Sequence, residues 1–175
     1  MSMSDSERQF SQPVRIGHGY DVHRFGDSGD HITLGGVKIP HDHGLEAHSD
    51  GDVLIHAVCD ALLGAIAAGD IGQHFPDSDS QYENIDSCIL LQKVYEKVKQ
   101  SGYELANADI SVIAQAPVLH PYMQSMCERL SQVLNVSKEQ INIKATTTEK
   151  LGYLGRKEGI AAHAVVLICH NHKHQ

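Results

Sequence analysis

The sequence predicts a single domain of the α/β or α+β class, with helices packed against one β-sheet. Segments with strand character alternate along the chain with segments of helical periodicity. With 175 residues, 41% of them hydrophobic, the chain is long enough for one domain with a real core and too short for two. Residues 1–13 are expected to form a disordered leader, and the histidine-rich residues 170–175 a disordered tail.

The first elements are two strands and a helix. Residues 14–20 and 31–39 have strand composition on either side of the turn sequence GDSGD. Ser49 can cap the helix that follows, with Asp52 three residues later in a pattern close to a capping box. Apolar residues then recur at helical spacing, and Gly69 is placed to end the helix.

The last strand of the chain carries information about assembly. The remaining elements, in order, are a polar loop (75–86), a helix (87–100) ended by Gly102, a strand (108–116), a helix (121–135), and strands at 141–147 and 159–169. Residues 160–168 are apolar except for His163, so this strand needs cover on both faces. One layer of helices covers only one face. We favour a second subunit on the other face over a strand at the centre of a sandwich.

Charge and composition restrict the partners and the compartment. The net charge of −8, the isoelectric point near 5.8 and the absence of Lys/Arg runs argue against nucleic acid or an anionic membrane surface. A phosphorylated small molecule stays compatible if metal ions or backbone amides supply positive potential. Neither a signal-peptide core nor an apolar stretch of about 20 residues occurs. The four cysteines are widely spaced, which favours buried free thiols in a reducing cytoplasm.

Histidine and aspartate are concentrated in GHGYDVHRF and HSDGDVLIH, residues 17–25 and 48–56. Asp21 and His23 are two residues apart in an extended segment, so their side chains leave the backbone on the same side. With His56, in the second turn of the expected helix, they offer the donors of a three-ligand zinc site with one open position. The same spacing equally fits a hydrogen-bonded Asp–His pair at a turn and an unrelated helix histidine.

Three further segments have chemistry suited to phosphates or polar substrates. His48 and Ser49 flank an expected helix N-terminus, which favours an anion but also fits plain capping by Ser49. The sequence KATTTEK, residues 144–150, offers hydroxyls, amines and a carboxylate for phosphate and Mg²⁺, or is an exposed Thr-rich strand edge. The sequence GDIGQHFPDSD, residues 69–79, could hold the hydroxyls of a small substrate or be a solvated loop.

Taken together, these segments resemble one enzyme family. The blocks RIGHGYDVHRF, GLEAHSDGDVLIHAVCDALLGA, GDIGQHFPDSD, IAQAP and NIKATTTEKLGYLGRKEGIAAHAV occur in this order. They resemble the 2-C-methyl-D-erythritol 2,4-cyclodiphosphate synthases of the non-mevalonate isoprenoid pathway, over residues 14–169 as one catalytic domain. The resemblance implies an α+β fold whose mixed β-sheet is covered by helices on one face and meets a homotrimer interface with the other. It places active sites between neighbouring subunits.

The resemblance also implies the reaction. The substrate is 4-diphosphocytidyl-2-C-methyl-D-erythritol 2-phosphate, whose 2-phosphate attacks the β-phosphorus of the cytidine diphosphate moiety. A cyclic diphosphate forms and CMP leaves, which makes the enzyme a phosphorus–oxygen lyase. An apolar cavity on the trimer axis, near Arg156 and Glu158, is able to take an isoprenoid-like molecule.

Individual functional residues follow from the same resemblance. Asp21, His23 and His56 match zinc ligands, and Glu149 matches a residue that helps hold a second divalent cation, Mg²⁺ or Mn²⁺. His48 and Thr147 match positions that steady the transition state. Residues 114–117 and 146–149 match the cytidine and diphosphate pocket, the latter from the adjacent subunit. The expected substrate contacts are Asp21, His23, His48, Ser49, Asp70, Ile71, Gly72, Phe75, Pro76, Asp77, Ser78, Asp79, Ala114, Gln115, Ala116, Pro117, Thr146, Thr147, Thr148, Glu149, Tyr153 and Arg156.

Two other functions are compatible with the same residues. A zinc-dependent phosphohydrolase would use an activated water at the open metal position and needs a general base beside the zinc. A non-catalytic trimer that binds isoprenoid phosphates or metals would not need the HSDGD and TTTEK blocks, which are intact here.

Overall fold

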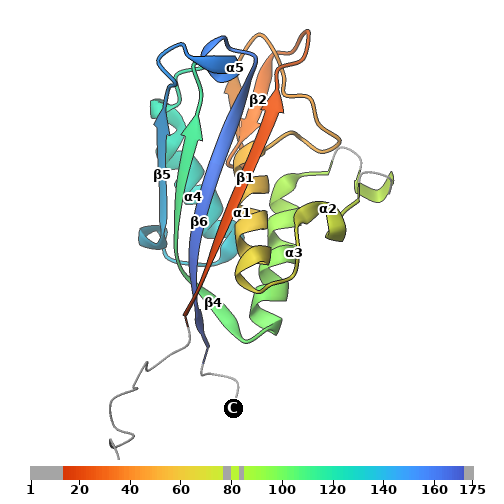
Figure 1. Ribbon diagram of the computed structural model, residues 1–175, viewed down its shortest axis with the longest axis vertical. Helices are drawn as coiled ribbons and strands as arrows, with labels where there is room; N and C mark the ends of the chain where they lie inside the picture. The colour runs from red at the N-terminus through yellow and green to blue at the C-terminus, as the bar shows by residue number, and fades with distance from the viewer. Residues whose placement is uncertain (1–13, 77–79, 83–84, 172–175) are drawn as a thin grey trace, which may run out of the picture.

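The computed structural model of the chain describes residues 14–76, 80–82 and 85–171. The elements in order are β1 (Val14–Arg24), β2 (His31–Leu34), β3 (Val37–Pro40), α1 (Val53–Ala65), α2 (Ile71–His74), η2 (Ser80–Tyr82), α3 (Ser87–Gln100), β4 (Tyr103–Ile113), η3 (His120–Tyr122), α4 (Met123–Leu134), η4 (Lys138–Gln140), β5 (Ile141–Thr146), α5 (Gly152–Gly155) and β6 (Gly159–His170). Helices α1, α3 and α4 lie on one face of the main sheet (Figure 1). None of the described helices has the length and apolarity that crossing a membrane requires.

The main sheet has four strands in the order β1-β6-β4-β5. β6 pairs antiparallel with both β1 and β4, whereas β4 and β5 are parallel. This mixed sheet with its helical layer confirms the expected α+β class. The core lies between the sheet and the helices, where every second residue of β6 from Ile160 to Ile168 is fully buried.

Two glycines of β1 bring α1 into direct contact with the sheet. A Cβ atom on Gly17 would lie 1.7 Å from the carbonyl oxygen of Ala61, and one on Gly19 would lie 1.9 Å from that of Ala57. No other residue type fits at so close an approach of helix and strand backbones. The contact holds the N-terminal turn of α1 beside the C-terminal end of β1.

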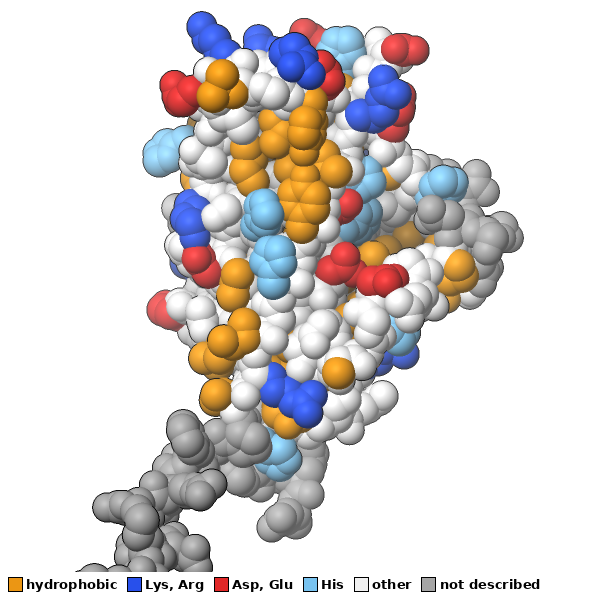
Figure 2. Space-filling view, in the orientation of Figure 1, with side chains coloured by type: hydrophobic (Ala, Val, Ile, Leu, Met, Phe, Trp, Pro, Cys, Tyr) orange, Lys and Arg blue, Asp and Glu red, His pale blue; other side chains and the backbone are white. Residues whose placement is uncertain are grey.

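Most of the other face of the sheet is not covered by the described part of the chain; α5 lies at one end of it, where the hydroxyls of Tyr153 and Tyr20 are 2.8 Å apart. The exposed apolar side chains of this face, called here the open face, are Val14, Ile16, Tyr20, Val22 and Val165, each 40–69% exposed. Figure 2 shows hydrophobic side chains along β1 and β6 on this face, interrupted by histidines. His18 and His163 are such a pair, with Nε2 and Nδ1 3.1 Å apart.

Residues 31–39 do not form the single expected strand. They form the hairpin β2–β3, which is a separate two-stranded sheet, and β1 pairs with β6 instead. Gly35 and Gly36 have φ angles of 58° and 70°, as the tightest hairpin turns require. Two adjacent glycines therefore reverse the chain within a segment whose composition alone suggests one strand.

The expected capping of the first helix by Ser49 is wrong. Asp52 is the N-cap of α1, and its carboxylate accepts a hydrogen bond from Ile55 N at 3.0 Å. The same carboxylate accepts from the backbone N–H groups of Gly35 and Gly36 at 2.9 and 2.6 Å. Asp52 is the N-cap because its one buried carboxylate accepts hydrogen bonds from backbone N–H groups both at the start of the helix and in the hairpin turn.

Other boundaries shift by a few residues, and α3 keeps its expected bounds. α1 ends at Ala65, before Gly69, and the strand expected at 108–116 is β4, which runs from Tyr103 to Ile113. The short helices α2 and α5 were not expected. β6 reaches His170, the first residue of the expected tail. The expected leader, residues 1–13, and residues 172–175 lie outside the described residues. All four cysteines are free.

Candidate metal centre and substrate site

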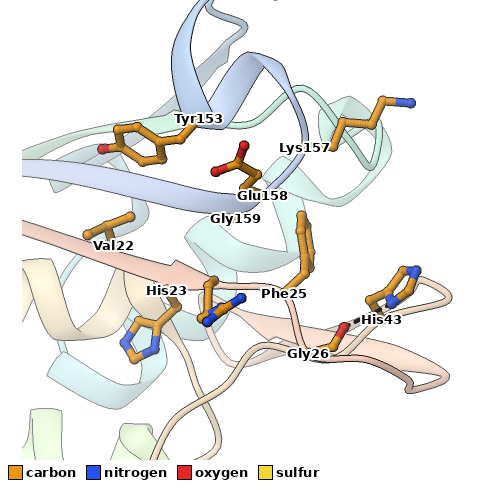
Figure 3. A pocket seen from close by; sticks show the side chains of 10 residues that line it. Val22, His23, Phe25, Gly26, His43, Tyr153, Lys157, Glu158 and Gly159 are labelled. Atoms are coloured by element: carbon orange, nitrogen blue, oxygen red, sulfur yellow. Dashed lines mark hydrogen bonds between the residues drawn. The ribbon is translucent and has the colours of Figure 1, made fainter.

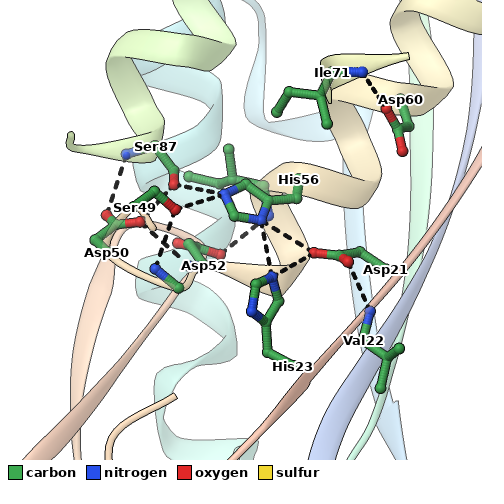
Figure 4. A network of polar contacts seen from close by, with 12 residues as sticks. Asp21, Val22, His23, Ser49, Asp50, Asp52, His56, Asp60, Ile71 and Ser87 are labelled. Atoms are coloured by element: carbon green, nitrogen blue, oxygen red, sulfur yellow. Dashed lines mark hydrogen bonds and ion pairs between the residues drawn. The ribbon is translucent and has the colours of Figure 1, made fainter. Parts of the chain in front are cut away.

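Asp21, His23 and His56 converge on one point, and these three residues are called here the metal cluster (Figure 4). Asp21 Oδ2 lies 2.9 Å from His23 Nε2 and 3.0 Å from His56 Nδ1, and the two nitrogens are 3.2 Å apart. The side chains are 25%, 16% and 12% exposed, respectively. The three side chains that were expected to share a site therefore lie together.

Local structure explains why these side chains meet. Asp21 and His23 occupy alternate positions of β1 on the face that α1 covers, as their spacing predicted. His56 is the fourth residue of α1, in its first turn and not its second, because the helix begins one residue after Asp52. The glycines of β1 set the short distance between strand and helix.

Hydrogen bonds behind the metal cluster fix its outer atoms. His23 Nδ1 donates to the carbonyl oxygen of Glu46 at 2.8 Å, so this nitrogen carries a hydrogen. Asp21 Oδ1 accepts from Val22 N at 2.8 Å. On the far side of the imidazole, His56 Nε2 lies 3.1 Å from Ser49 Oγ and 3.0 Å from Ser87 Oγ.

The electrostatics of the metal cluster fit a bound cation. In the metal-free protein, burial opposes ionisation of Asp21, but the contacts with the imidazoles of His23 and His56 outweigh it and hold the pKa of this carboxyl well below its usual range. For His23, burial lowers the pKa, while hydrogen bonds to Asp21 and to the Glu46 carbonyl raise it above its usual value overall.

The hydrogen count leads to the same conclusion. With its hydrogen on Nδ1, a neutral His23 has only a lone pair on Nε2, which faces Asp21 Oδ2 at 2.9 Å. Two lone pairs at this distance need either an extra proton or a cation between them. Two imidazole nitrogens and one carboxylate oxygen are also the donor set of a zinc site that leaves one position open.

A second group of expected site residues gathers at the ends of β4 and β5. Residues 114–117 and 146–149 are called here the strand-end cluster. Ala114 N donates to Thr146 O, and Lys150 N donates to Gln115 Oε1, both at 3.0 Å. Thr147 Oγ1 donates to Glu149 Oε1 at 2.8 Å, so a hydroxyl and a carboxylate lie side by side. Such oxygens suit a hard divalent cation and phosphate.

The structure keeps these two clusters apart within one chain. Val22 pairs with Ala161, Ala161 with Ile113, and Ile113 with Thr146. The two outer strands of this row are three strand intervals apart, or about 14 Å at the usual spacing. Glu149 accordingly is not part of the metal cluster.

The remaining expected residues are distributed over several other segments. His48 is exposed in the loop before α1. Asp70 caps α2 by accepting from Gln73 N at 2.9 Å, and Ile71 and Gly72 lie in this helix. Phe75 is buried against Tyr82, and Pro76 is exposed. Asp77, Ser78 and Asp79 lie outside the described residues. Tyr153 shares a hydroxyl contact of 2.8 Å with Tyr20, and Arg156 Nε donates to Glu158 Oε1 at 2.6 Å.

A pocket of about 590 Å³ borders the metal cluster at His23 (Figure 3). Its lining comprises the residues Val22, His23, Arg24, Phe25, Gly26, His43, Tyr153, Lys157, Glu158 and Gly159. The wall thus joins the end of β1 to the segment between α5 and β6. Cationic, anionic and apolar side chains all contribute to it, so a ligand with both charged and apolar parts fits its chemistry.

Sequence reasoning missed Asp50 and Ser87, which stand behind His56. Ser87 is fully buried, and its hydroxyl donates to Asp50 Oδ1 at 2.5 Å. Asp50 lies in the HSDGD block, so its position in the sequence between His48 and His56 could have indicated a role beside the metal cluster. Ser87 is 31 residues beyond His56 and is brought to it only by the packing of α3 on α1. No local pattern indicates that contact.

Comparisons with known proteins agree on one family. The model of the YgbB family matches residues 14–169. The chain is 61% identical over 155 residues, or 89% of its length, to proteins of Ectopseudomonas mendocina and Vibrio cholerae, each covered to 98%. Both are named 2-C-methyl-D-erythritol 2,4-cyclodiphosphate synthase.

Solved structures share the fold. The bifunctional IspDF from Campylobacter jejuni is 46% identical with a TM-score of 0.88; the match covers 91% of this chain and 43% of that protein. The CDP complex of IspF from Plasmodium falciparum is 37% identical with a TM-score of 0.79, and the match covers 90% and 97% of the two chains. With the metal cluster and the strand-end cluster inside the matched range, the chain belongs to the YgbB family.

Proposed function

We propose that this chain converts 4-diphosphocytidyl-2-C-methyl-D-erythritol 2-phosphate into 2-C-methyl-D-erythritol 2,4-cyclodiphosphate and CMP, in isoprenoid biosynthesis. The observation that carries the proposal is the 61% identity over nearly the whole length of relatives named for this activity. The cluster of three metal-ligating groups in the structure supports the proposal. A solved relative in complex with CDP supports it as well. The four free thiols are consistent with a reducing cytoplasm.

The reaction needs no protein nucleophile. An oxygen of the substrate 2-phosphate forms a bond to the β-phosphorus, and the bond from that phosphorus to the bridging oxygen breaks. The bridging oxygen and its electron pair leave with CMP. Two anionic phosphates must approach each other, so the requirements on the protein are positioning and charge compensation.

Two cations fit this requirement, and the chain has a donor set for each. Asp21, His23 and His56 would hold zinc, and Glu149 would help hold Mg²⁺ or Mn²⁺. When bound, these ions polarise phosphate oxygens and neutralise charge on the departing CMP. Thr147 places its hydroxyl beside Glu149, where it would donate to phosphate oxygens, and His48 would approach the reacting phosphates from the loop before α1.

Substrate contacts follow the two clusters. Ser49, Asp70, Ile71, Gly72 and residues 75–79 would hold the methylerythritol phosphate near the metal cluster. The strand-end cluster would bind cytidine through Ala114, Gln115, Ala116 and Pro117, and the diphosphate through Thr146, Thr147, Thr148 and Glu149. Tyr153 and Arg156 would complete the contacts.

Separation of the clusters supports a site shared between chains. Both cations must act on one diphosphate, whose phosphorus atoms are adjacent, yet within one chain the two donor sets are carried by β1 and by the end of β5, strands about 14 Å apart across the sheet. The open face supplies an apolar surface that copies of the chain would cover. We therefore propose a homotrimer that closes around this face, with an axial cavity near Arg156 and Glu158 suited to an isoprenoid-like molecule.

The test is ³¹P NMR of the zinc-loaded protein with Mg²⁺ and the diphosphocytidyl substrate. The proposal predicts resonances of CMP and of a cyclic diphosphate. CMP with a linear product would replace it with a zinc-dependent phosphohydrolase. An unchanged substrate spectrum would leave a non-catalytic trimer that binds metals or isoprenoid phosphates.

A further inference from the structure

Ser87 and Asp50 form a chain of hydrogen bonds that ends on the metal cluster. Ser87 Oγ lies 3.0 Å from His56 Nε2 and 2.5 Å from Asp50 Oδ1, and Asp50 Oδ2 accepts from Ser87 N at 3.2 Å (Figure 4). Ser87 is one of two fully buried polar residues among the described residues. The three groups come from α1, from the first residue of α3 and from the loop before α1.

The hydrogen bonds of Ser87 favour one tautomer of His56. A carboxylate only accepts, so Asp50 takes the single hydroxyl hydrogen of Ser87. Toward His56, Ser87 Oγ can then only accept, and this contact is a hydrogen bond when the hydrogen of His56 lies on Nε2. Nδ1 is left with a lone pair, and this is the atom that faces Asp21 and His23.

The same tautomer decides the role of Ser49. Its oxygen lies 3.1 Å from His56 Nε2 and accepts from Gly51 N at 3.3 Å. In the Nε2–H tautomer, Ser49 cannot donate to this nitrogen. The hydroxyl hydrogen of Ser49 is then available to a ligand bound in front of the metal cluster.

We propose that Asp50 and Ser87 are positioning residues that fix His56 as the Nε2–H tautomer, present Nδ1 to the cation and direct the hydroxyl hydrogen of Ser49 to the substrate. This inference rests on the ligand set of the proposed function. A histidine that binds a metal through one nitrogen is generally held by a carboxylate or carbonyl at the other, and here a buried hydroxyl relays the carboxylate. His23 has the direct version of this support, in the carbonyl oxygen of Glu46.

A purely structural role for Ser87 is a weaker account of the same contacts. Asp86 already caps α3 by accepting from Cys88 N at 2.8 Å. Capping therefore does not require the side-chain contact between Ser87 and Asp50. Among the described residues, the hydroxyl of Ser87 contacts only Asp50 and His56. The contact with Asp50 therefore orients this hydroxyl toward His56.

The experiment compares Ser87→Ala with Ser49→Ala in the full chain. Both remove a hydroxyl about 3 Å from the same nitrogen, but only Ser87 has a carboxylate behind it. Zinc affinity is measured by competition with a chelator. Ser87→Ala should weaken zinc binding by roughly 10- to 100-fold, the usual effect of losing such support. Ser49→Ala should keep the wild-type affinity and lose turnover.

Two further measurements keep the inference falsifiable if Ser87→Ala folds poorly. Asp50→Asn retains the shape of the carboxyl, and it should weaken zinc binding in the same direction. Proton–nitrogen correlation NMR of the zinc-loaded wild type should place the His56 hydrogen on Nε2. A hydrogen on Nδ1 would overturn the inference, as would unchanged zinc affinity in Ser87→Ala and Asp50→Asn, or an equal loss in Ser49→Ala.

The wild-type titration separates this inference from the proposed function. A wild type without a tight zinc site would contradict the ligand set itself and both proposals. A tight zinc site that Ser87→Ala leaves untouched would contradict only the role of Ser87 and Asp50.

Discussion

The two polar clusters of this chain differ in how far one chain completes them. The metal cluster is largely buried, and both of its histidines have a further hydrogen bond with another part of the fold, His23 to the Glu46 carbonyl and His56 to Ser87. In the strand-end cluster, Thr146, Thr147 and Glu149 are exposed, and the hydrogen bonds of Thr147 and Glu149 reach only two residues along the chain. The comparison indicates that one chain completes the metal cluster by itself. The strand-end cluster is left incomplete, and a neighbouring chain would complete it.

The largest effect is expected from separating the chains. Ile16→Asp places a carboxylate in the open face, where Ile16 is 69% exposed, and burying that charge between subunits is unfavourable. The oligomer should dissociate and turnover should be lost, while the zinc content stays at its wild-type value. Light scattering, zinc analysis and turnover of the same sample measure all three.

The matched control for this change is Ile89→Asp. Ile89 is 43% exposed on α3, on the other side of the molecule from the open face. It should leave mass and turnover unchanged. Wild-type turnover in a monomeric Ile16→Asp protein would contradict the shared site.

The next effect concerns the strand-end cluster alone. Thr147→Ala removes the hydroxyl beside Glu149, and one lost donor to developing charge lowers turnover by roughly 10- to 1000-fold. Zinc content should not change because Thr147 lies outside the metal cluster. Steady-state kinetics and metal analysis check both expectations. Thr33→Ala in β2 is the control and should keep wild-type turnover. Unchanged turnover in Thr147→Ala would show that Thr147 is not part of the site.

A smaller effect should link the metal cluster to the fold. Gly17→Ala places a Cβ atom 1.7 Å from Ala61 O, so α1 must move away from β1. Overpacking of this kind lowers the free energy of unfolding by about 1–3 kcal/mol and should weaken zinc binding as well. In Gly64→Ala the nearest atom is 4.0 Å away, and a helical alanine should leave stability equal or higher. Urea unfolding of Gly17→Ala and Gly64→Ala measures the difference in stability. Equal free energies of unfolding for the two variants would contradict this prediction.

The smallest effect is a pH dependence of the metal-free protein. The pKa of Asp21 is lowered on folding, so its stabilising contribution is present above the unfolded pKa and is lost as pH falls toward the folded pKa. The pKa of His23 is raised, so its contribution is present below pH about 6.5 and is lost as pH rises through the folded pKa. After chelation, His23→Gln should therefore destabilise the protein more at pH 6 than at pH 8.5. Thermal unfolding measures this, and an equal loss at both pH values would contradict it.

Sequence patterns offered the metal cluster as one of two interpretations because its members obey local rules, and the family resemblance favoured it. The alternation of an extended strand placed Asp21 and His23 on one side, and His56 needed only a helix that starts near it. Patterns failed where tertiary contacts decide. Ser49 is a good capping residue in isolation, but Asp52 also satisfies the Gly35–Gly36 turn and therefore takes the cap.

The family resemblance placed residues 146–149 on an adjacent subunit, but no pattern in the residues themselves indicates which cluster a single chain completes. The TTTEK block has suitable chemistry, yet its distance from the metal cluster follows from the strand order β1-β6-β4-β5, which no local pattern encodes. The apolar last strand did indicate a surface in need of cover, because its residues were apolar at both odd and even positions. Only the register with β1 shows which side chains make up the open face.

The most direct test of the shared site is complementation between two inactive chains. His56→Ala disables the metal cluster, and Glu149→Gln disables the strand-end cluster. Mixed oligomers from co-expression of both chains should recover about one quarter of wild-type activity, since each site needs one intact half from each kind of chain. Activity no higher than that of either variant alone would show that both clusters of a site come from the same chain, and would contradict the account.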